Sequence, residues 1–347
     1  MAQMKVKHKI KVLIVDDSLL FRETLSREMS NDLGIEVVGT ASDPFIARDM
    51  ILELKPDVLT LDVEMPKMNG IEFLKKLMPQ YPLPVIVVSS SSKNVLDALN
   101  AGAVEFVTKP DMNRSGGMSS FINELKIKIK IASTAKVGNQ KKEYIPKNLV
   151  SSKGIDMINT VIAIGASTGG TEAIFTVISA LPRDMPPIVI VQHMPPVFTR
   201  LYAERLNHSC NLEVKEAEDG DALKPGRVLI APGEYQMRLV KKPSGYFVKC
   251  SKEEKVSGHC PSVDVLFDSV SETVGKKAIG VILTGMGRDG AKGLLNMKKT
   301  GAYTIGQDEK TSIVYGMPMV AFNIGAVIKQ LPLEEISEGI VRYLAKK

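Results

Sequence analysis

Short apolar runs alternate with segments of helical spacing through the first third of this chain, and this alternation constrains its fold most. The helical spacing is clearest at residues 18–29 and 70–78. The apolar runs lie at residues 11–17, 35–42, 57–62, 84–90 and 103–110. Strands that alternate with helices form a parallel sheet with helices on both faces. We therefore predict a doubly wound parallel α/β domain.

The rest of the chain contains similar strand-like runs, in TVIAIGASTGG, PPIVIVQHMPP and KAIGVILTGMGRDG. Each run stops at a turn that contains glycine or proline. A chain of 347 residues that is 44% hydrophobic and 24% charged is long enough for two separate cores. We predict two doubly wound parallel-sheet domains, at residues 1–125 and 155–347, with a linker at 126–154. The second domain is expected to be Rossmann-like.

The formal net charge of +6 is concentrated in and around the predicted linker. Residues 121–153 hold eight lysines against Glu124 and Glu143, and eight minus two equals the net charge of the whole chain. The Lys, Asn, Gln and Ser content is typical of a solvated linker. Aromatic stacking residues and a recognition-helix pattern do not accompany the lysines, so we expect no nucleic-acid partner. A basic arm that touches an anionic protein is the alternative.

Membrane insertion and secretion are not expected. No apolar run approaches the roughly 20 residues that a membrane-spanning helix needs, and the first residues pass from lysines directly into a strand. The cysteines Cys210, Cys250 and Cys260 have no metal-binding spacing and cannot all pair within one chain. A reducing, cytoplasmic location is therefore expected.

Acidic and polar residues stand at the ends of the first-domain strands. Asp16 and Asp17 end the first strand, Asp62 the third, Ser89 the fourth and Lys109 the fifth, and in such sheets these ends share one rim. Carboxylates gathered in one place favour a hard divalent cation such as Mg²⁺. Asp62 could then accept a phosphoryl group, with Lys109 and Ser89 assisting. Taken singly, the aspartates could be helix N-caps and Lys109 a surface charge.

At these positions the first half resembles a response-regulator receiver domain, a flavodoxin-like fold. The resemblance covers about residues 9–125 and rests on VDDS, LDVEMPKMNG, VVSS and FVTKP in that order. It implies phosphorylation of Asp62 and a cis Lys109–Pro110 peptide. It further implies that Mg²⁺ is held by Asp16 or Asp17 with Asp62 and the Glu64 carbonyl, and that Ser89, Phe106 and Lys109 form the switch.

In the second half, GASTG fits the G-x-S-x-G pattern, whose glycines permit a sharp strand-to-helix turn that exposes a serine hydroxyl. Ser167 is therefore a candidate nucleophile. The pentapeptide alone is a weak signal. Ser167 could merely cap the helix expected at 171–181, or the turn could hold a phosphate, although the full G-x-G-x-x-G spacing is absent.

A base and an orienting acid are needed beside a serine nucleophile. The chain has four histidines, His8, His193, His208 and His259, of which His193 directly follows a strand and His259 is the other pocket candidate. Asp289 follows a further strand, in a glycine-rich turn that also permits the plain role of a helix N-cap. The N–H groups of that turn, at 285–287, or of Thr168 could bind an oxyanion.

Nearly the whole chain resembles the chemotaxis protein-glutamate methylesterases of the CheB type. The resemblance rests on GASTGG, VQHMPP, APG, GHCPSVDVLF and ILTGMGRDGA after a receiver domain. It implies hydrolysis of glutamyl methyl esters on methyl-accepting chemoreceptors, deamidation of receptor glutamines, and phosphorylation by the chemotaxis histidine kinase. No cofactor is implied for ester hydrolysis. The residues it implies are Ser167 as nucleophile, His193 as base, Asp289 as orienting acid, Thr168 and Met286 near the oxyanion, and His259 as a substrate contact.

One polypeptide with both sites suggests that the unphosphorylated receiver covers the triad, so a fragment from about residue 155 onward is expected to outperform the unmodified chain. Two other classes of function stay open. The first is a non-enzymatic regulator with a receiver and a binding module, which predicts a basic recognition element. The second is a serine esterase or amidase of small molecules, which predicts turnover without receptor preference.

Overall fold

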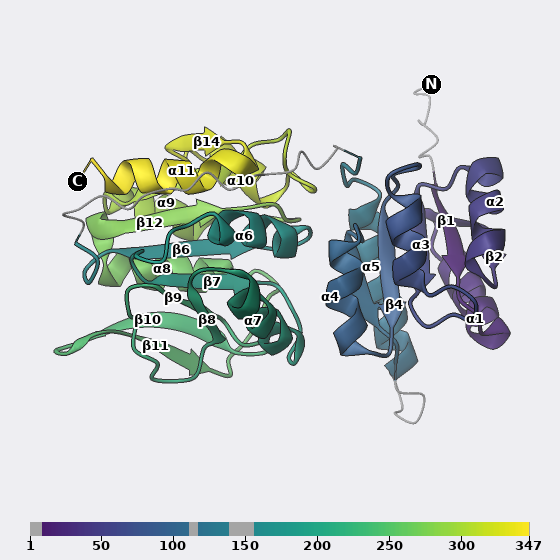
Figure 1. Ribbon diagram of the computed structural model, residues 1–347, viewed down its shortest axis with the longest axis horizontal. Coiled ribbons are helices and arrows are strands. Elements are labelled where there is room, and N and C mark those ends of the chain that lie inside the picture. Colours follow the sequence, from purple (N-terminus) through teal and green to yellow (C-terminus); the bar gives the residue numbers. More distant parts are fainter. Residues whose placement is uncertain (1–8, 111–116, 139–155, 347) are drawn as a thin grey trace, which may run out of the picture. The chain divides into compact units, whose positions relative to one another are not determined.

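The computed structural model describes residues 9–110, 117–138 and 156–346. The chain forms two compact units, 1–140 and 141–347 (Figure 1). Both units are parallel α/β folds, as the alternation in the sequence predicts. Among the described residues, no helix is both long and apolar enough to span a membrane.

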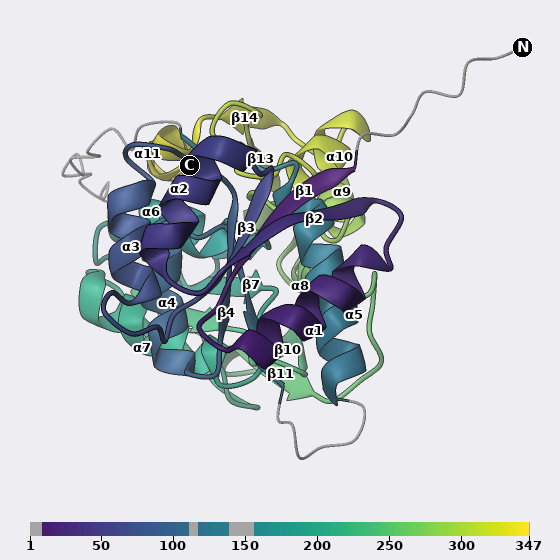
Figure 2. The ribbon, with the colours of Figure 1, turned by 90° about the vertical axis from the view of Figure 1, so that its right-hand side faces the viewer.

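The sheet of the first unit contains, in its described part, five parallel strands in the order β2-β1-β3-β4-β5. This is the flavodoxin-like order. The strands are β1 (Ile10–Val15), β2 (Ile35–Ala41), β3 (Val58–Asp62), β4 (Val85–Ser89) and β5 (Glu105–Thr108). Figure 2 shows α1 (Leu19–Ser30) and α5 (Gly117–Ala132) on one face, and α2 (Pro44–Leu54), α3 (Gly70–Leu77) and α4 (Ser92–Asn100) on the other.

Local sequence explains where these helices begin. Ser18, Asp43 and Asn69 each accept a hydrogen bond from the first turn of α1, α2 and α3. The strands are near-continuous apolar runs because helices cover both faces of the sheet. One core of this unit joins the sheet to α1 and α5 through side chains that include Ile14, Leu25 and Leu125.

Two expectations for the first half are wrong. Helix α5 continues past residue 125 to Ala132, because Ile129 and Ala132 are fully buried in the core and extend its apolar face. The first part of the expected linker therefore belongs to this unit, whereas residues 139–154 lie outside the described residues. The Lys109–Pro110 peptide is not cis; Cys260–Pro261 is the cis peptide bond found within the described ranges.

The second unit has a parallel sheet of seven described strands, in the order β14-β13-β12-β6-β7-β9-β8. The strands are β6 (Val161–Ala166), β7 (Ile188–Gln192), β8 (Glu213–Glu216), β9 (Arg227–Ile230), β12 (Ala278–Ile282), β13 (Tyr303–Gln307) and β14 (Lys329–Leu331). Every strand pair in this sheet is parallel, which confirms the expected fold class.

Helices cover both faces of this sheet. On one face, α6 (Gly170–Ser179) contacts α7 (Phe198–Ser209) and α11 (Leu333–Leu344), and on the other α9 (Ala291–Lys299) contacts α8 (Val263–Thr273) and α10 (Met317–Asn323) (Figure 1). A short 3-10 helix, η1 (Gly275–Lys277), precedes β12. The core between the sheet and α8 includes the fully buried Val263, Phe267 and Leu294.

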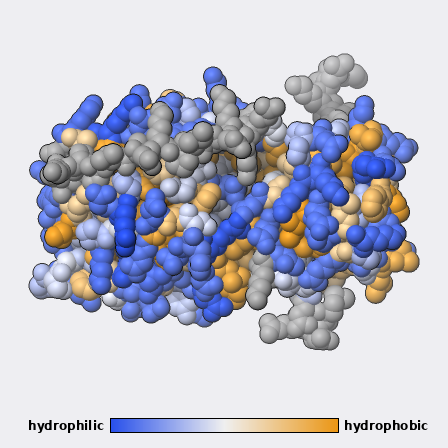
Figure 3. Space-filling view, in the orientation of Figure 1, coloured by the Kyte–Doolittle hydropathy of each residue, from blue (hydrophilic) through white to orange (hydrophobic). Residues whose placement is uncertain are grey.

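An antiparallel hairpin, β10 (Gln236–Lys242) and β11 (Gly245–Ser251), is an addition that the sequence patterns above do not predict. Its inner face packs on α8 through Met237, Leu239 and Val248. Its outer face carries lysines, and the visible surface over the hairpin is mostly hydrophilic (Figure 3). The chain leaves β11 toward the loop that carries His259.

Each sheet has a point at which the strand order reverses. In the first sheet β1 lies between β2 and β3, and in the second β6 lies between β7 and β12. Ligands bind beyond the carboxyl ends of the strands at such points. Both groups of candidate residues predicted from the sequence stand there.

Candidate active site and phosphorylation site

Ser167 is the first residue after β6, at a sharp turn into α6. Its N–H donates to Thr284 O (3.0 Å) and its carbonyl accepts from Gly170 N (2.7 Å). Gly169 has φ +75, and a Cβ there would lie 2.7 Å from Ile313, so glycine is needed for the turn. The side chain of Ser167 is half-buried. The turn thus holds the serine hydroxyl at the carboxyl edge of the sheet.

The loop after β12 approaches this serine closely. A Cβ at Gly285 would lie 2.6 Å from Ser167 Cβ and 3.0 Å from its backbone nitrogen. Because real Cβ atoms are not found at such separations, only glycine lets the two chain segments come together here. The glycine-rich sequence TGMGRDG therefore serves close packing against the candidate nucleophile.

His193 follows β7, the neighbour of β6, and its N–H donates to Ala166 O (3.2 Å). Its Nε2 lies 2.8 Å from Oδ2 of Asp289. The side chains of His193 and Asp289 are 8% and 1% exposed. The predicted base and orienting acid, which are far apart in sequence, are therefore in direct contact. The Nδ1 atom of His193 is buried and has no hydrogen-bond partner among the described residues.

Asp289 is held by the N-terminus of α8. Its carboxylate accepts from Ser262 Oγ (2.8 Å), Val263 N (2.7 Å) and Asp264 N (3.1 Å) as well as from His193. Burial alone would raise the pKa of Asp289, but the hydrogen bonds from His193 and Ser262 outweigh it, so the pKa lies below its usual value. The carboxylate is consequently ionised at neutral pH.

The ionised carboxylate fixes the tautomer of the imidazole. A carboxylate only accepts hydrogen bonds, so neutral His193 carries its proton on Nε2 and leaves the Nδ1 lone pair open. The basic atom of His193 is therefore Nδ1. In this structure Ser167 Oγ does not hydrogen bond to it, since Nδ1 has no partner in the described part of the chain.

Of the three N–H groups at residues 285–287, two are open to an acceptor in the described part of the chain. Gly285 N–H already donates to Val314 O (3.0 Å), which removes it from the expected oxyanion donors. The N–H groups of Met286 and Gly287 have no acceptor within the described residues. Thr168 is buried beside Ser167, and its carbonyl accepts from Thr284 Oγ1 (3.0 Å).

His259 contacts the candidate base directly. Its ring stacks on that of His193, with ring centroids 3.6 Å apart and planes inclined by 7°. Burial, together with His193 and Lys255, lowers the pKa of His259 to about 4 against the opposing effect of Asp289. A ring with this pKa is neutral at physiological pH.

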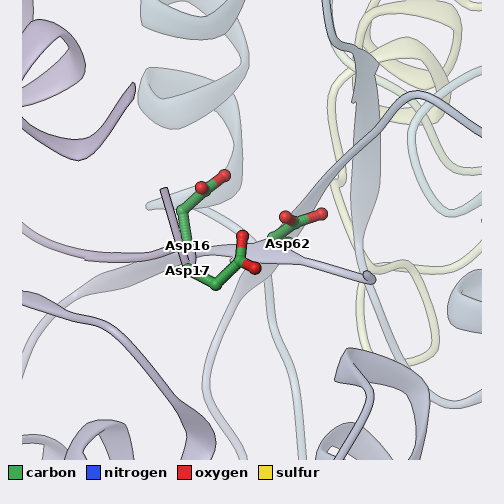
Figure 4. A group of neighbouring side chains, drawn as sticks. All are labelled: Asp16, Asp17 and Asp62. Carbon is green, nitrogen blue, oxygen red and sulfur yellow. The ribbon is translucent and has the colours of Figure 1, made fainter. Parts of the chain in front are cut away.

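The acidic group of the first unit lies together at the ends of β1 and β3. The carboxylate oxygens of Asp16, Asp17 and Asp62 lie within 4.8 Å of one another (Figure 4). Asp16 and Asp62 are buried, whereas Asp17 is exposed. A set of three hard oxygen donors with one side open to water fits Mg²⁺. In addition, Glu64 N–H donates to Asp62 Oδ1 (3.1 Å).

Lys109 lies between two of these acids. Its Nζ is 2.8 Å from Asp16 Oδ2 and 2.6 Å from Asp62 Oδ2. Burial raises the pKa of Asp62 above its usual value, against the opposing effect of Lys109. Burial alone would lower the pKa of Lys109, but the hydrogen bonds to Asp16 and Asp62 outweigh it and raise the pKa. The lysine therefore remains charged beside the carboxylates.

The two remaining switch residues, Ser89 and Phe106, are both buried. Ser89 accepts through Oγ from Ser91 N (3.1 Å). Phe106 is buried at 3% exposure, and Lys128 Nζ lies 5.0 Å from the centroid of its ring.

Comparison with known proteins agrees with this division of the chain. Residues 162–340 match the CheB methylesterase family, and residues 12–115 match the response regulator receiver domain family. The chain belongs to the CheB methylesterase family. It is accordingly a hydrolase with a receiver domain.

The similarity of this CheB methylesterase family member to relatives extends over its whole length. It is 60% identical over 336 residues to a protein-glutamate methylesterase/protein-glutamine glutaminase of Syntrophomonas wolfei, covering 97% of this chain and 98% of that one. A protein of the same name from Syntrophotalea carbinolica is 51% identical over 348 residues, covering 98% and 99%. The crystal structure of the Thermotoga maritima CheB methylesterase catalytic domain has a TM-score of 0.52 and 41% identity, covering 53% of this chain and 98% of that domain.

The structure of this CheB family chain adds site residues that sequence reasoning missed. Ser262 and the N-terminus of α8 bind Asp289, and Gln236 donates to the carbonyl of His259. A signal for the first was present, because Ser262 starts SVDVLF, a serine directly before an apolar helical segment. No local pattern marks Gln236, which acts across 23 residues of sequence.

Proposed function

We propose that this chain hydrolyses glutamyl methyl esters on methyl-accepting chemoreceptors, and deamidates receptor glutamines, with Ser167, His193 and Asp289 as its catalytic triad. The observation that carries the proposal is the 2.8 Å contact of His193 with Asp289 beside Ser167, with Nδ1 left open. The names of the relatives support the substrate class.

Acylation follows from the positions of these groups. Ser167 Oγ attacks the glutamyl carbonyl carbon as its proton passes to His193 Nδ1, and Asp289 stabilises the resulting imidazolium through Nε2–H. The oxyanion accepts from N–H groups at Thr168 and Met286, each typically contributing about 3 kcal/mol. The C–O bond to the methoxy group breaks, and methanol leaves with the proton from Nδ1.

Hydrolysis of the acyl-enzyme reverses these roles. His193 Nδ1 removes a proton from water, hydroxide oxygen bonds to the acyl carbon, and Ser167 leaves with the proton returned. Free glutamate is the product. A glutaminyl side chain follows the same route with ammonia as the leaving group. All proton transfers pass through one imidazole, so the ester hydrolysis proceeds with this chain's own residues.

The receiver half supplies control. The Asp62 carboxylate accepts a phosphoryl group from a phosphohistidine of the chemotaxis histidine kinase, so that the P–N bond breaks and an acyl phosphate forms. Asp16, Asp17, Asp62 and the Glu64 carbonyl would hold Mg²⁺, which when bound offsets charge on the phosphoryl oxygens. Lys109 pairs with the same group, and Ser89 and Phe106 respond to it as the switch. The reducing cytoplasm is the compartment that suits the unpaired cysteines.

Methanol release from methylated receptor membranes tests the proposal. The native chain, Ser167→Ala and Asp62→Asn are compared with and without a small phosphodonor. We expect Ser167→Ala to lose release under both conditions, and Asp62→Asn to keep basal release but lose stimulation. Undiminished release from Ser167→Ala would refute the triad. Equal release from small esters and from receptor membranes would instead indicate a general esterase.

A further inference from the structure

We propose that His259 is a positioning residue, which holds the imidazole of His193 in the one orientation that joins Nε2 to Asp289 and leaves Nδ1 open toward Ser167. This inference rests on the proposed function. It assigns His259 a role other than the substrate contact implied by the family resemblance.

The stacked ring supplies a restraint that the carboxylate cannot. A single hydrogen bond at Nε2 holds one atom of the His193 ring but does not by itself fix the tilt of the ring. No second bond limits this tilt, because Nδ1 has no partner among the described residues. The His259 ring, parallel to within 7° at 3.6 Å, lies against the face of the imidazole and blocks rotation out of the plane.

A tight hairpin turn carries His259. Val256 N donates to His259 O (3.0 Å) and His259 N donates to Val256 O (2.9 Å). The two residues between them, Ser257 and Gly258, have φ +53 and +87, the signs that a type I′ turn requires. Serine is unusual at such a φ, and its hydroxyl donates to the buried Asp264 Oδ2 (3.2 Å), which fastens the turn to α8.

The buried side-chain amide of Gln236 connects His259 to α8, the helix that binds Asp289. Gln236 is 0% exposed, and its Nε2 donates to the carbonyls of His259 and Glu254 (3.2 Å each). Its Oε1 accepts from Ser262 N (2.8 Å), and Ser262 Oγ donates to Asp289. The stacked ring and the orienting carboxylate are therefore connected through Gln236 and Ser262, and their separation is fixed by buried hydrogen bonds.

The charge state of His259 suits this role and excludes catalysis by it. The groups that face it are His193, Asp289 and Lys255, and with burial they leave the pKa at about 4. The ring is therefore neutral when His193 becomes an imidazolium and does not repel it. A group that becomes protonated only as the pH falls to about 4 is also a poor general base at neutral pH.

The test compares His259→Phe, which keeps a stacked ring, with His259→Ala, which removes it, in the full chain. The substrate is a synthetic peptide with a glutamyl methyl ester, and methanol release gives kcat and KM. The measurements run from about pH 5 to about pH 9, which spans the range in which imidazoles titrate. Ser167→Ala is the inactive reference. His208→Ala, on the exposed last turn of α7, is the control for loss of a histidine elsewhere. Circular dichroism checks that each variant folds.

We expect His259→Phe and His208→Ala to keep most of the native kcat. For His259→Ala, kcat should fall roughly tenfold to a hundredfold with KM little changed, as expected for a misplaced reacting group. The acid limb of its pH–rate profile should move to higher pH, because water that replaces the ring solvates the imidazolium.

Two results would overturn the inference. Native kcat and an unmoved acid limb in folded His259→Ala would show that the stack positions nothing. A raised KM with native kcat in both His259 variants would assign the residue to substrate binding instead. Neither result affects the triad, which fails only if Ser167→Ala remains active.

Discussion

Asp289→Asn should uncouple the triad while changing the shape of the site very little. The carboxylate accepts four hydrogen bonds, from Ser262 Oγ and Asp264 N at Oδ1, and from Val263 N and His193 Nε2 at Oδ2. An amide offers one acceptor oxygen and one NH₂ donor in place of the two oxygens. Either orientation of the amide therefore sets a donor against a backbone N–H.

The orientation decides which function is lost. If the NH₂ group takes the Oδ2 position, it faces Val263 N–H and donates to His193 Nε2. The imidazole proton then moves to Nδ1, which can no longer accept the proton of Ser167. With NH₂ at Oδ1 it faces Asp264 N–H, and the tautomer is kept, but the charge that stabilises the imidazolium is gone. One unsatisfied buried N–H costs about 1–3 kcal/mol of stability. The loss in kcat should be on the order of 10³- to 10⁴-fold.

Two measurements check this prediction. Urea unfolding gives the stability change as a shift in midpoint at unchanged slope, and methanol release gives kcat. Asp268→Asn is the control, since its carboxylate, on the helix α8 whose N-terminus binds Asp289, accepts from Asn296 Nδ2 away from the triad. If Asp289→Asn kept within about tenfold of native kcat, Asp289 would not orient the base by the tautomer mechanism described here.

Three further predictions follow from particular contacts. Gly285→Ala places a Cβ 2.6 Å from that of Ser167 and should lower kcat roughly a hundredfold in a folded protein; native kcat would contradict the close approach. Because the pKa of His259 falls from 6.5 to about 4 on folding, the unfolded chain binds more protons between these values, and stability declines as pH drops. In His259→Phe, the loss of unfolding free energy between pH 7 and pH 4.5 should be smaller by about 1–2 kcal/mol, after allowance for the partial exposure of His259. Urea midpoints at the two pH values measure this difference. The same loss in the native chain and the variant would contradict the lowered pKa of His259. Nitrogen-15 spectra of neutral His193 should show the proton on Nε2, and a proton on Nδ1 would contradict the assignment of the base.

The sequence predicts the strand-end residues well because parallel strands have a fixed geometry. Asp16, Asp62, Ser167 and His193 all stand at a strand end or directly after it. The carboxyl ends of adjacent parallel strands share one edge, so the side chains there gather without further information. Fold class, the acidic group and the positions of Ser167 and His193 follow from this rule.

The features of the site that the sequence does not predict depend on contacts between distant segments. The hairpin loop that places His259 on His193 is fixed by Gln236, whose role is visible only when β10, this loop and α8 are assembled. The choice between Nε2 and Nδ1 depends on the ring rotation of His193, which residue spacing does not encode. The extension of α5 to Ala132 was missed because its lysine-rich exposed face resembles a linker, while Ile129 packs inward.

Acyl-enzyme trapping tests the central claim most directly. The native chain is mixed with p-nitrophenyl acetate, quenched in acid during turnover, digested and examined by mass spectrometry. The account predicts an acetyl group on the peptide that contains Ser167, and none at that position in Ser167→Ala. Turnover with the acetyl group on another residue, or with no acylated residue at all, would contradict it.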